Sequence, residues 1–255
     1  MKFDDVMMRY EFVKTKYLAP YELKFCSAFI NKYPRFAEAY IDRGHIYNSV
    51  KKYSKAIADY TKALEIEQDA FTYRSRADAY MALKKYKYAI KDLKNAVRLE
   101  SKKKEKNSDY LVKLADCYEE AGQYNLAIKI FNSLIKDKKA NVYIHFHLAR
   151  IYASCNDARF RNGKKAIFHA KKADVLRKIY RKSKKLKIGS SALHLDLLAA
   201  AYAQAGQFKK AVTLQKKAVK QMQNHQYLPK LESRLNLYQS RRPYIRKRGS
   251  TGGWL

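Results

Sequence analysis

Histidines are the first residues to test for metal binding or acid–base chemistry. The chain has six: His45, His145, His147, His169, His194 and His225. His145 and His147 lie two positions apart, so on a helix they point to different faces. A pair of metal ligands on one helix needs a spacing of three or four positions. The spacing therefore indicates packed or surface histidines and predicts no metal site.

Cysteines give no sign of a covalent or metal-bound framework. Cys26, Cys117 and Cys155 lie far apart, and none forms a C-x-x-C pair. This pattern argues against a disulfide scaffold or a zinc ribbon and favours a reducing compartment. Cys117 and Cys155 each lie near a tyrosine of the repeat described below. We expect both to be small buried side chains rather than reactive thiols.

Sequence motifs for nucleophilic catalysis and phosphate binding are also missing. The chain contains no phosphate-binding glycine loop, no G-x-S-x-G and no H-E-x-x-H. The sequence therefore predicts a non-catalytic protein that needs no cofactor, and an enzyme is kept only as a remote alternative.

Composition favours helices. Among 255 residues, 47% are hydrophobic, and there are only 8 glycines and 4 prolines, which argues against turn-rich β architectures. No stretch of the sequence is close to the length of about 20 apolar residues that a membrane-spanning helix needs. The first ten residues include Asp4 and Asp5 and do not resemble a secretory signal. These features predict a cytoplasmic protein without a transmembrane segment.

A repeated pattern organises most of the chain. A tyrosine is followed by alanine nine residues later, a large residue four further on, and a small or apolar residue three after that. The matching sets are Tyr47/Ala56/Tyr60/Ala63, Tyr80/Ala89/Leu93/Ala96, Tyr118/Ala127/Phe131/Leu134 and Tyr202/Ala211/Gln215/Ala218. A degenerate copy joins Tyr152 to Ala166 through a longer turn. Self-similarity at this period is typical of stacked structural repeats.

Each copy is interpreted as a helical hairpin. Its small residues allow two helices to approach closely, and its aromatic residues fill the space between hairpins. Gly122 and Gly206 mark the turn between the two helices. A single hairpin cannot bury its apolar face alone, so the copies must stack.

These residues resemble the tetratricopeptide repeat (TPR). The resemblance implies an all-α protein, a right-handed superhelical α-solenoid of TPR-like helical hairpins. It places an N-terminal cap or half-repeat over residues 1–36 and repeats over 37–222. The individual repeats would span about 37–69, 70–101, 108–140, 142–175 and 192–222. A capping helix would cover 223–245, followed by a flexible basic tail over 246–255.

The resemblance also implies that the first helix of each hairpin lines a concave groove that binds a protein or peptide segment. The groove residues would be Ile41, Asp42, His45, Arg74, Asp78, Val112, Lys113, Asp116, Phe146, His147, Arg150, Asp196 and Leu197. Some TPR modules hold the C-termini of chaperones with a two-carboxylate clamp. The matching positions here are Ile41, His45, Ser75, Asp109 and Lys113. Only Lys113 suits such a clamp, so this ligand is rejected.

Positive charge is concentrated in the second half of the chain. The net charge is +32, and residues 141–255 hold 26 Lys and Arg against four acids. Lysines follow one stripe opposite the apolar stripe of the helix after Gly163 and continue into the last hairpin. The candidate anion-binding residues are Lys164, Lys171, Lys178, Lys182, Lys185, Lys209 and Lys216. A solvated surface without a ligand is the other explanation of this stripe.

Three functional hypotheses follow. The leading one is a non-catalytic scaffold that binds a partner segment in the concave groove. The second is a protein that binds nucleic acid, a ribosome or another polyanion through its basic half. The third is contact with an anionic membrane surface, which is ranked last because the apolar stripe of the basic helix is rich in alanine.

Overall fold

The computed structural model describes residues 19–101, 108–137, 141–184, 191–223 and 225–246, and the side chains of 181–184 are not described. In these ranges the chain forms twelve α-helices and one short 3-10 helix, with no strand. The protein is therefore an all-α helical-repeat solenoid, as predicted. No helix within these ranges is long and apolar enough to cross a membrane.

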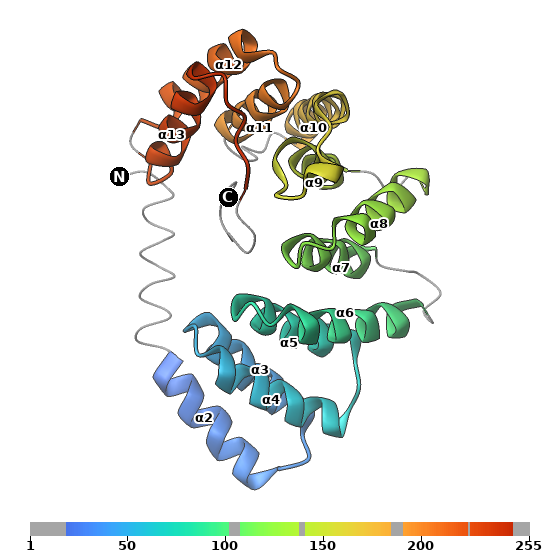
Figure 1. Ribbon diagram of the computed structural model, residues 1–255. Coiled ribbons are helices and arrows are strands. Elements are labelled where there is room, and N and C mark those ends of the chain that lie inside the picture. Colours follow the sequence, from blue (N-terminus) through green and yellow to red (C-terminus); the bar gives the residue numbers. More distant parts are fainter. Residues whose placement is uncertain (1–18, 102–107, 138–140, 185–190, 224, 247–255) are drawn as a thin grey trace. The chain divides into compact units, whose positions relative to one another are not determined.

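The chain divides into two compact units, residues 1–117 and 118–255, and the boundary falls within helix α7. The helices of the first unit, drawn in blue to green in Figure 1, pair as hairpins α3–α4 and α5–α6, preceded by α2. Their bounds are Ala19–Lys32 for α2, Ala37–Ser49 for α3, Tyr53–Ile66 for α4, Ala70–Ala82 for α5, Tyr86–Ser101 for α6 and Asp109–Glu120 for α7.

In the second unit α9 pairs with α10 and α11 with α12, and α13 packs on α12. The bounds are Tyr124–Lys136 for α8, Val142–Ser154 for α9, Gly163–Lys184 for α10, Ser191–Gln204 for α11, Phe208–Gln221 for α12 and Leu228–Gln239 for α13. The 3-10 helix η2, Ala158–Phe160, lies in the longer turn of the degenerate copy. The expected hairpin starts were near residues 37, 70, 108, 142 and 192, and the first helices begin at Ala37, Ala70, Asp109, Val142 and Ser191.

The repeated alanines are completely buried between helices. Ala56, Ala89, Ala127 and Ala211 have no exposed surface, as expected for residues that let neighbouring helices approach. Gly44 serves the same purpose, because a Cβ atom there would lie 2.7 Å from Cε1 of Tyr60. The repeated small residues therefore set the spacing of the helices, since protein interiors are close-packed and leave no room for larger side chains.

Four short turns between paired helices each contain a residue with a left-handed backbone. Gly122 and Gly206 occupy this position with φ of 77° and 75°. Lys51 and Lys84 occupy it in the first two repeats with φ of 60° and 57°, at a steric cost that glycine does not carry. The two predicted turn glycines are thus explained by backbone conformation.

We expect Gly206→Ala to lower the free energy of unfolding by about 1 kcal/mol. A Cβ atom at Gly206 would meet no atom within 4 Å, so the whole loss comes from backbone conformation. Lys84→Gly, at the equivalent turn, is the matched control and should cause no loss. Chemical denaturation of both variants checks this, and equal stability of Gly206→Ala and the wild type would contradict it.

Two buried histidines join α9 to α10. Nδ1 of His145 lies 2.9 Å from Nδ1 of His169, and the ring of Tyr152 stacks on His169 with centroids 5.8 Å apart. One ring must donate a hydrogen bond and the other accept it, so at least the accepting ring is uncharged in this contact. Burial lowers the pKa of His145, with a smaller effect from Lys172. Burial also lowers the pKa of His169 to about 4, assisted by His145 and Lys165.

The histidine pair predicts a stability that depends on pH. Between about pH 6.5 and 4 the unfolded chain takes up protons that folded His169 excludes, so the unfolding free energy falls as the pH falls. Between pH 7 and pH 4.5, the unfolding free energy of His169→Phe should fall by on the order of 2 kcal/mol less than that of the wild type. Urea denaturation of both proteins at the two pH values measures it. An unchanged pH dependence in the variant would contradict the prediction.

Candidate protein-binding site

A surface pocket of about 570 Å³ in the first unit contains two of the expected groove residues. We call it the α2–α3 pocket, and it is lined by Tyr21, Glu22, Phe25, Cys26, Asp42, His45 and Ile46. Tyr21 and Phe25 are 75% and 66% exposed, which is unusual for large aromatic side chains in a folded chain. Burial raises the pKa of the Cys26 thiol, so this thiol is protonated at neutral pH and is a poor nucleophile.

His45 connects the α2–α3 pocket to helix α5. Its Nε2 atom lies 3.3 Å from Oγ of Ser75, and its ring meets the edges of Tyr60 and Phe71 with centroids 5.5 and 5.4 Å away. Burial lowers the pKa of His45, and Asp42 only partly offsets this effect, so His45 is neutral at pH 7. Phe71 is 49% exposed and extends the aromatic surface beyond the pocket.

Further residues of the expected groove lie on the first helices α3, α5 and α7. Asp78 on α5 and Lys113 on α7 form an ion pair, with Nζ and Oδ1 2.7 Å apart and about a third of each side chain exposed. Ile41, Arg74 and Val112 are partly exposed. Exposed ion pairs contribute little stability, so both partners remain available to a ligand.

Other residues of the expected groove lie inside the protein. Asp116 and Phe146 are each 8% exposed and His147 is 4% exposed, while Asp196 and Leu197 are at 1% or less. Their positions along the first helices match those of a groove, but neighbouring side chains cover them. These five residues offer no surface to a ligand in this conformation.

A buried charge cluster in the second unit uses the predicted residues His147 and Arg150. Nδ1 of His147 and Nε of Arg150 each lie 2.8 Å from a carboxylate oxygen of Glu119. Arg246 completes the cluster through an ion pair with Glu119 and is 5% exposed. The expectation that Arg246 belongs to a flexible tail is therefore wrong. Sequence reasoning missed Glu119 and Arg246 as partners because they lie 127 positions apart.

The basic residues remain on the surface where they are described. Lys164, Lys171, Lys178, Lys209 and Lys216 are exposed, and Nζ of Lys178 pairs with Asp174 at 2.7 Å. The side chain of Lys182 and the whole of Lys185 lie outside the described residues. Among the five candidate lysines whose side chains are described, Lys178 thus has an acidic partner on its own helix.

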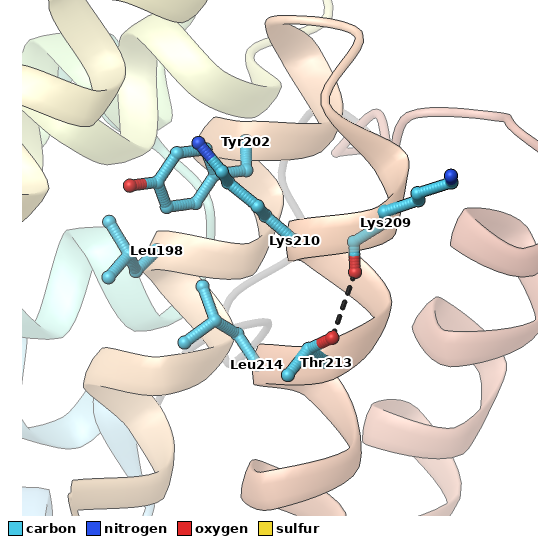
Figure 2. A pocket seen from close by; sticks show the side chains of 6 residues that line it. All are labelled: Leu198, Tyr202, Lys209, Lys210, Thr213 and Leu214. Atoms are coloured by element: carbon cyan, nitrogen blue, oxygen red, sulfur yellow. Dashed lines mark hydrogen bonds between the residues drawn. The ribbon is translucent and has the colours of Figure 1, made fainter.

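Figure 2 shows a smaller pocket of about 380 Å³ beside two lysines of the last hairpin. It is lined by Leu198, Tyr202, Lys209, Lys210, Thr213 and Leu214. Nζ of Lys210 lies 5.5 Å from the ring centroid of Tyr202, a cation–π arrangement, whereas Lys209 extends away from that ring. The hydroxyl of Thr213 donates to the backbone carbonyl of Lys209 at 3.0 Å.

Comparisons with known proteins agree with this architecture. Residues 37–69 and 74–142 each match a family model described as tetratricopeptide repeat. The comparison with curated protein sequences gave no match. Together with the helical-hairpin fold, the two matched regions identify the chain as a tetratricopeptide-repeat protein.

Solved structures with the same fold are distant in sequence. The Cut9–Hcn1 hetero-tetramer of the APC/C aligns over 87% of this chain with a TM-score of 0.63 and 16% identity, and the match spans only 40% of that protein's chain. YrrB, described as a TPR protein with an unusual peptide-binding site, aligns over 82% of this chain and 97% of its own with a TM-score of 0.54 and 19% identity. BtubC from P. vanneervenii aligns over 91% and 94% with a TM-score of 0.59 and 16% identity. At these identities the likeness establishes the fold alone.

Proposed function

We propose that this protein is a non-catalytic scaffold that binds a segment of a partner protein at the α2–α3 pocket and the adjoining Phe71. The observation that carries the proposal is the exposure of Tyr21 and Phe25 beside His45. Exposed aromatic side chains in a concave surface are typical anchors of protein interfaces, because they bury a large apolar area on binding. The TPR fold supports the same class of function.

The charges of the α2–α3 pocket indicate what kind of segment it would bind. Glu22 and Asp42 lie in the same lining as the two aromatic rings. A segment that presents an apolar side chain next to a lysine or arginine would bury its apolar group on Tyr21 and Phe25. Its cation would face the two carboxylates, a complementarity that favours specificity. We therefore propose a basic, partly apolar partner segment.

Affinity purification with a matched variant tests this function. Tyr21→Ala combined with Phe25→Ala removes the aromatic anchors, whereas Tyr88→Ala removes an aromatic side chain that is 55% exposed and stacks on Tyr80 of the same unit. A bound protein should be recovered with the wild type and with Tyr88→Ala, lost with the double variant, and unaffected by nuclease. Equal recovery from all three proteins would contradict the proposal.

A second candidate function is the binding of nucleic acid, and it rests on the exposed lysines of the second unit. We propose changing Lys164, Lys171, Lys209 and Lys216 to glutamine and titrating a mixed-sequence oligonucleotide at several salt concentrations. If these residues contact phosphates, affinity should fall alike for all sequences, and the log–log salt slope should shrink by about 0.7–0.9 per lost contact. An unchanged slope, or wild-type binding weaker than about 10⁻⁴ M at physiological salt, would rule out this function.

A further inference from the structure

The segment that follows α13 folds back onto the second unit (Figure 1). The ring of Tyr244 lies under the guanidinium of Arg234, with Cζ 4.4 Å from the ring centroid. Two residues later, the backbone N–H of Arg246 donates to the carbonyl of Ser154 at 2.7 Å. The segment is therefore anchored by a side-chain stack at one point and by a backbone hydrogen bond at the next.

The guanidinium of Arg246 is held by two adjacent carboxylates. One terminal nitrogen lies 2.9 Å from Oε1 of Glu119, and the other lies 3.3 Å from Oε1 of Glu120. Arg246 also opposes the rise in the pKa of Tyr124 that burial causes. A planar fork of donors matches these two carboxylates better than the single ammonium of a lysine would.

The position of the cluster favours a cation. Glu119 and Glu120 are the last residues of α7, and Ser154 is the last residue of α9. The C-terminal end of α7 therefore lies at the guanidinium and that of α9 at the backbone N–H of Arg246, and each helix end carries partial negative charge. The backbone charge at these two helix ends alone therefore favours a positive group at the site.

Arg246 supplies one of the two guanidiniums that face the two carboxylates of the cluster. Glu119 and Glu120 face two guanidiniums, those of Arg150 and Arg246. Although burial alone would raise the pKa of Glu119, Arg150, His147 and Arg246 hold it well below its ordinary value. Glu119 is thus ionised, and without Arg246 the carboxylates of Glu119 and Glu120 would be left with the guanidinium of Arg150 and the ring of His147.

We propose that this cluster is an arginine-binding site and that Arg246 is its internal ligand. When the C-terminal segment leaves, the same site takes the arginine of a partner segment of the form aromatic-x-arginine, which reproduces Tyr244 and Arg246. The C-terminal segment then acts as a competitor that closes the site within the free chain. This inference goes beyond the proposed function, because it concerns the second unit and does not depend on the α2–α3 pocket.

The test uses a fluorescent peptide with the sequence of residues 241–246, Arg-Arg-Pro-Tyr-Ile-Arg. In the full chain, Arg246→Ala should bind this peptide at least about tenfold more tightly than the wild type, because the two carboxylates are no longer occupied by a guanidinium of the chain's own C-terminal segment. Arg242→Ala, which removes an exposed arginine of the same segment, should behave like the wild type. A peptide with its last arginine changed to alanine should bind Arg246→Ala at least about tenfold more weakly.

Two results would overturn the proposal: equal peptide affinity for the wild type and Arg246→Ala, or equal affinity of the two peptides for Arg246→Ala. Circular dichroism establishes whether Arg246→Ala is folded, and Arg246→Gln replaces it if helicity is lost. If both variants unfold, the Nε–H resonance of Arg246 is followed by NMR in the wild type during peptide addition. Its movement to the position of a solvent-exposed arginine supports competition, and a resonance that stays in place at the highest peptide concentration contradicts it.

Discussion

Replacing Asp196 with alanine is expected to lower the free energy of unfolding by about 3–5 kcal/mol. Asp196 has no exposed surface, and its carboxylate accepts hydrogen bonds from Arg234 of α13 and, at 2.9 Å, from Nε2 of Gln215. Burial raises the pKa of Asp196 to about 6, while Arg234 and Gln215 oppose the rise, so the carboxylate is ionised at pH 7. Its removal leaves the guanidinium of Arg234 buried without its counter-ion. Thermal and urea denaturation measure the loss.

A double variant separates the lost ion pair from a lost packing contact. Replacing Asp196 with leucine and Arg234 with methionine removes both charges and restores apolar volume, so most of the stability should return. The matched comparison is Asp59→Ala, because Asp59 pairs with Arg43, whose side chain is 19% exposed and keeps access to water. Asp59→Ala should therefore lower the free energy of unfolding by clearly less than Asp196→Ala does. Equal losses for Asp59→Ala and Asp196→Ala would contradict the burial argument.

Tyr60→Ala is expected to cost about 3–5 kcal/mol, because it removes a large aromatic side chain from a packed interior. Tyr60 is 1% exposed and fills the space between α3 and α4 against Gly44. Gly44→Ala alone should cost about 1–3 kcal/mol, since the new methyl group would press on the Tyr60 ring. Chemical denaturation of each variant gives these values.

The double variant of Gly44→Ala and Tyr60→Ala tests whether these two residues contact each other. Its loss should be smaller than the sum of the single losses by about 1 kcal/mol or more, because the added methyl group then occupies part of the vacated space. Tyr88→Ala is the control and should cost about 1 kcal/mol or less, because the Tyr88 ring is 55% exposed and a stacked aromatic pair contributes about 0.5–1.5 kcal/mol. Strictly additive losses would show that Gly44 and Tyr60 do not share a contact.

The fold could be predicted because its determinants are local and repeated. Ala56, Ala89 and Ala127 recur at one position of the pattern, and all three are completely buried. The turn glycines Gly122 and Gly206 have the left-handed backbone that their place between helices requires. Because several copies share the same pattern, an ambiguous position in one copy can be assigned from the equivalent positions in the others.

The site could be predicted only in part, because exposure depends on contacts between distant residues. Asp42 and His45 line a surface pocket, whereas Asp196 lies at a comparable place on its helix and is buried. The difference comes from Arg234 of α13, which the repeat pattern does not include. Arg246 is a similar case, since a short basic segment gives no local sign that its arginine pairs with Glu119.

Site-specific photo-crosslinking tests the central claim, binding of a partner segment at the α2–α3 pocket, most directly. A photoreactive phenylalanine analogue is placed at Phe25 or Phe71 of the full chain and, as the matched control, at Tyr88, which is exposed on α6. We expect a discrete protein crosslinked from Phe25 and Phe71 but not from Tyr88, with the crosslinked segment carrying a lysine or arginine beside an apolar residue. Crosslinks of equal yield and identity from all three positions, or from Tyr88 alone, would contradict the account.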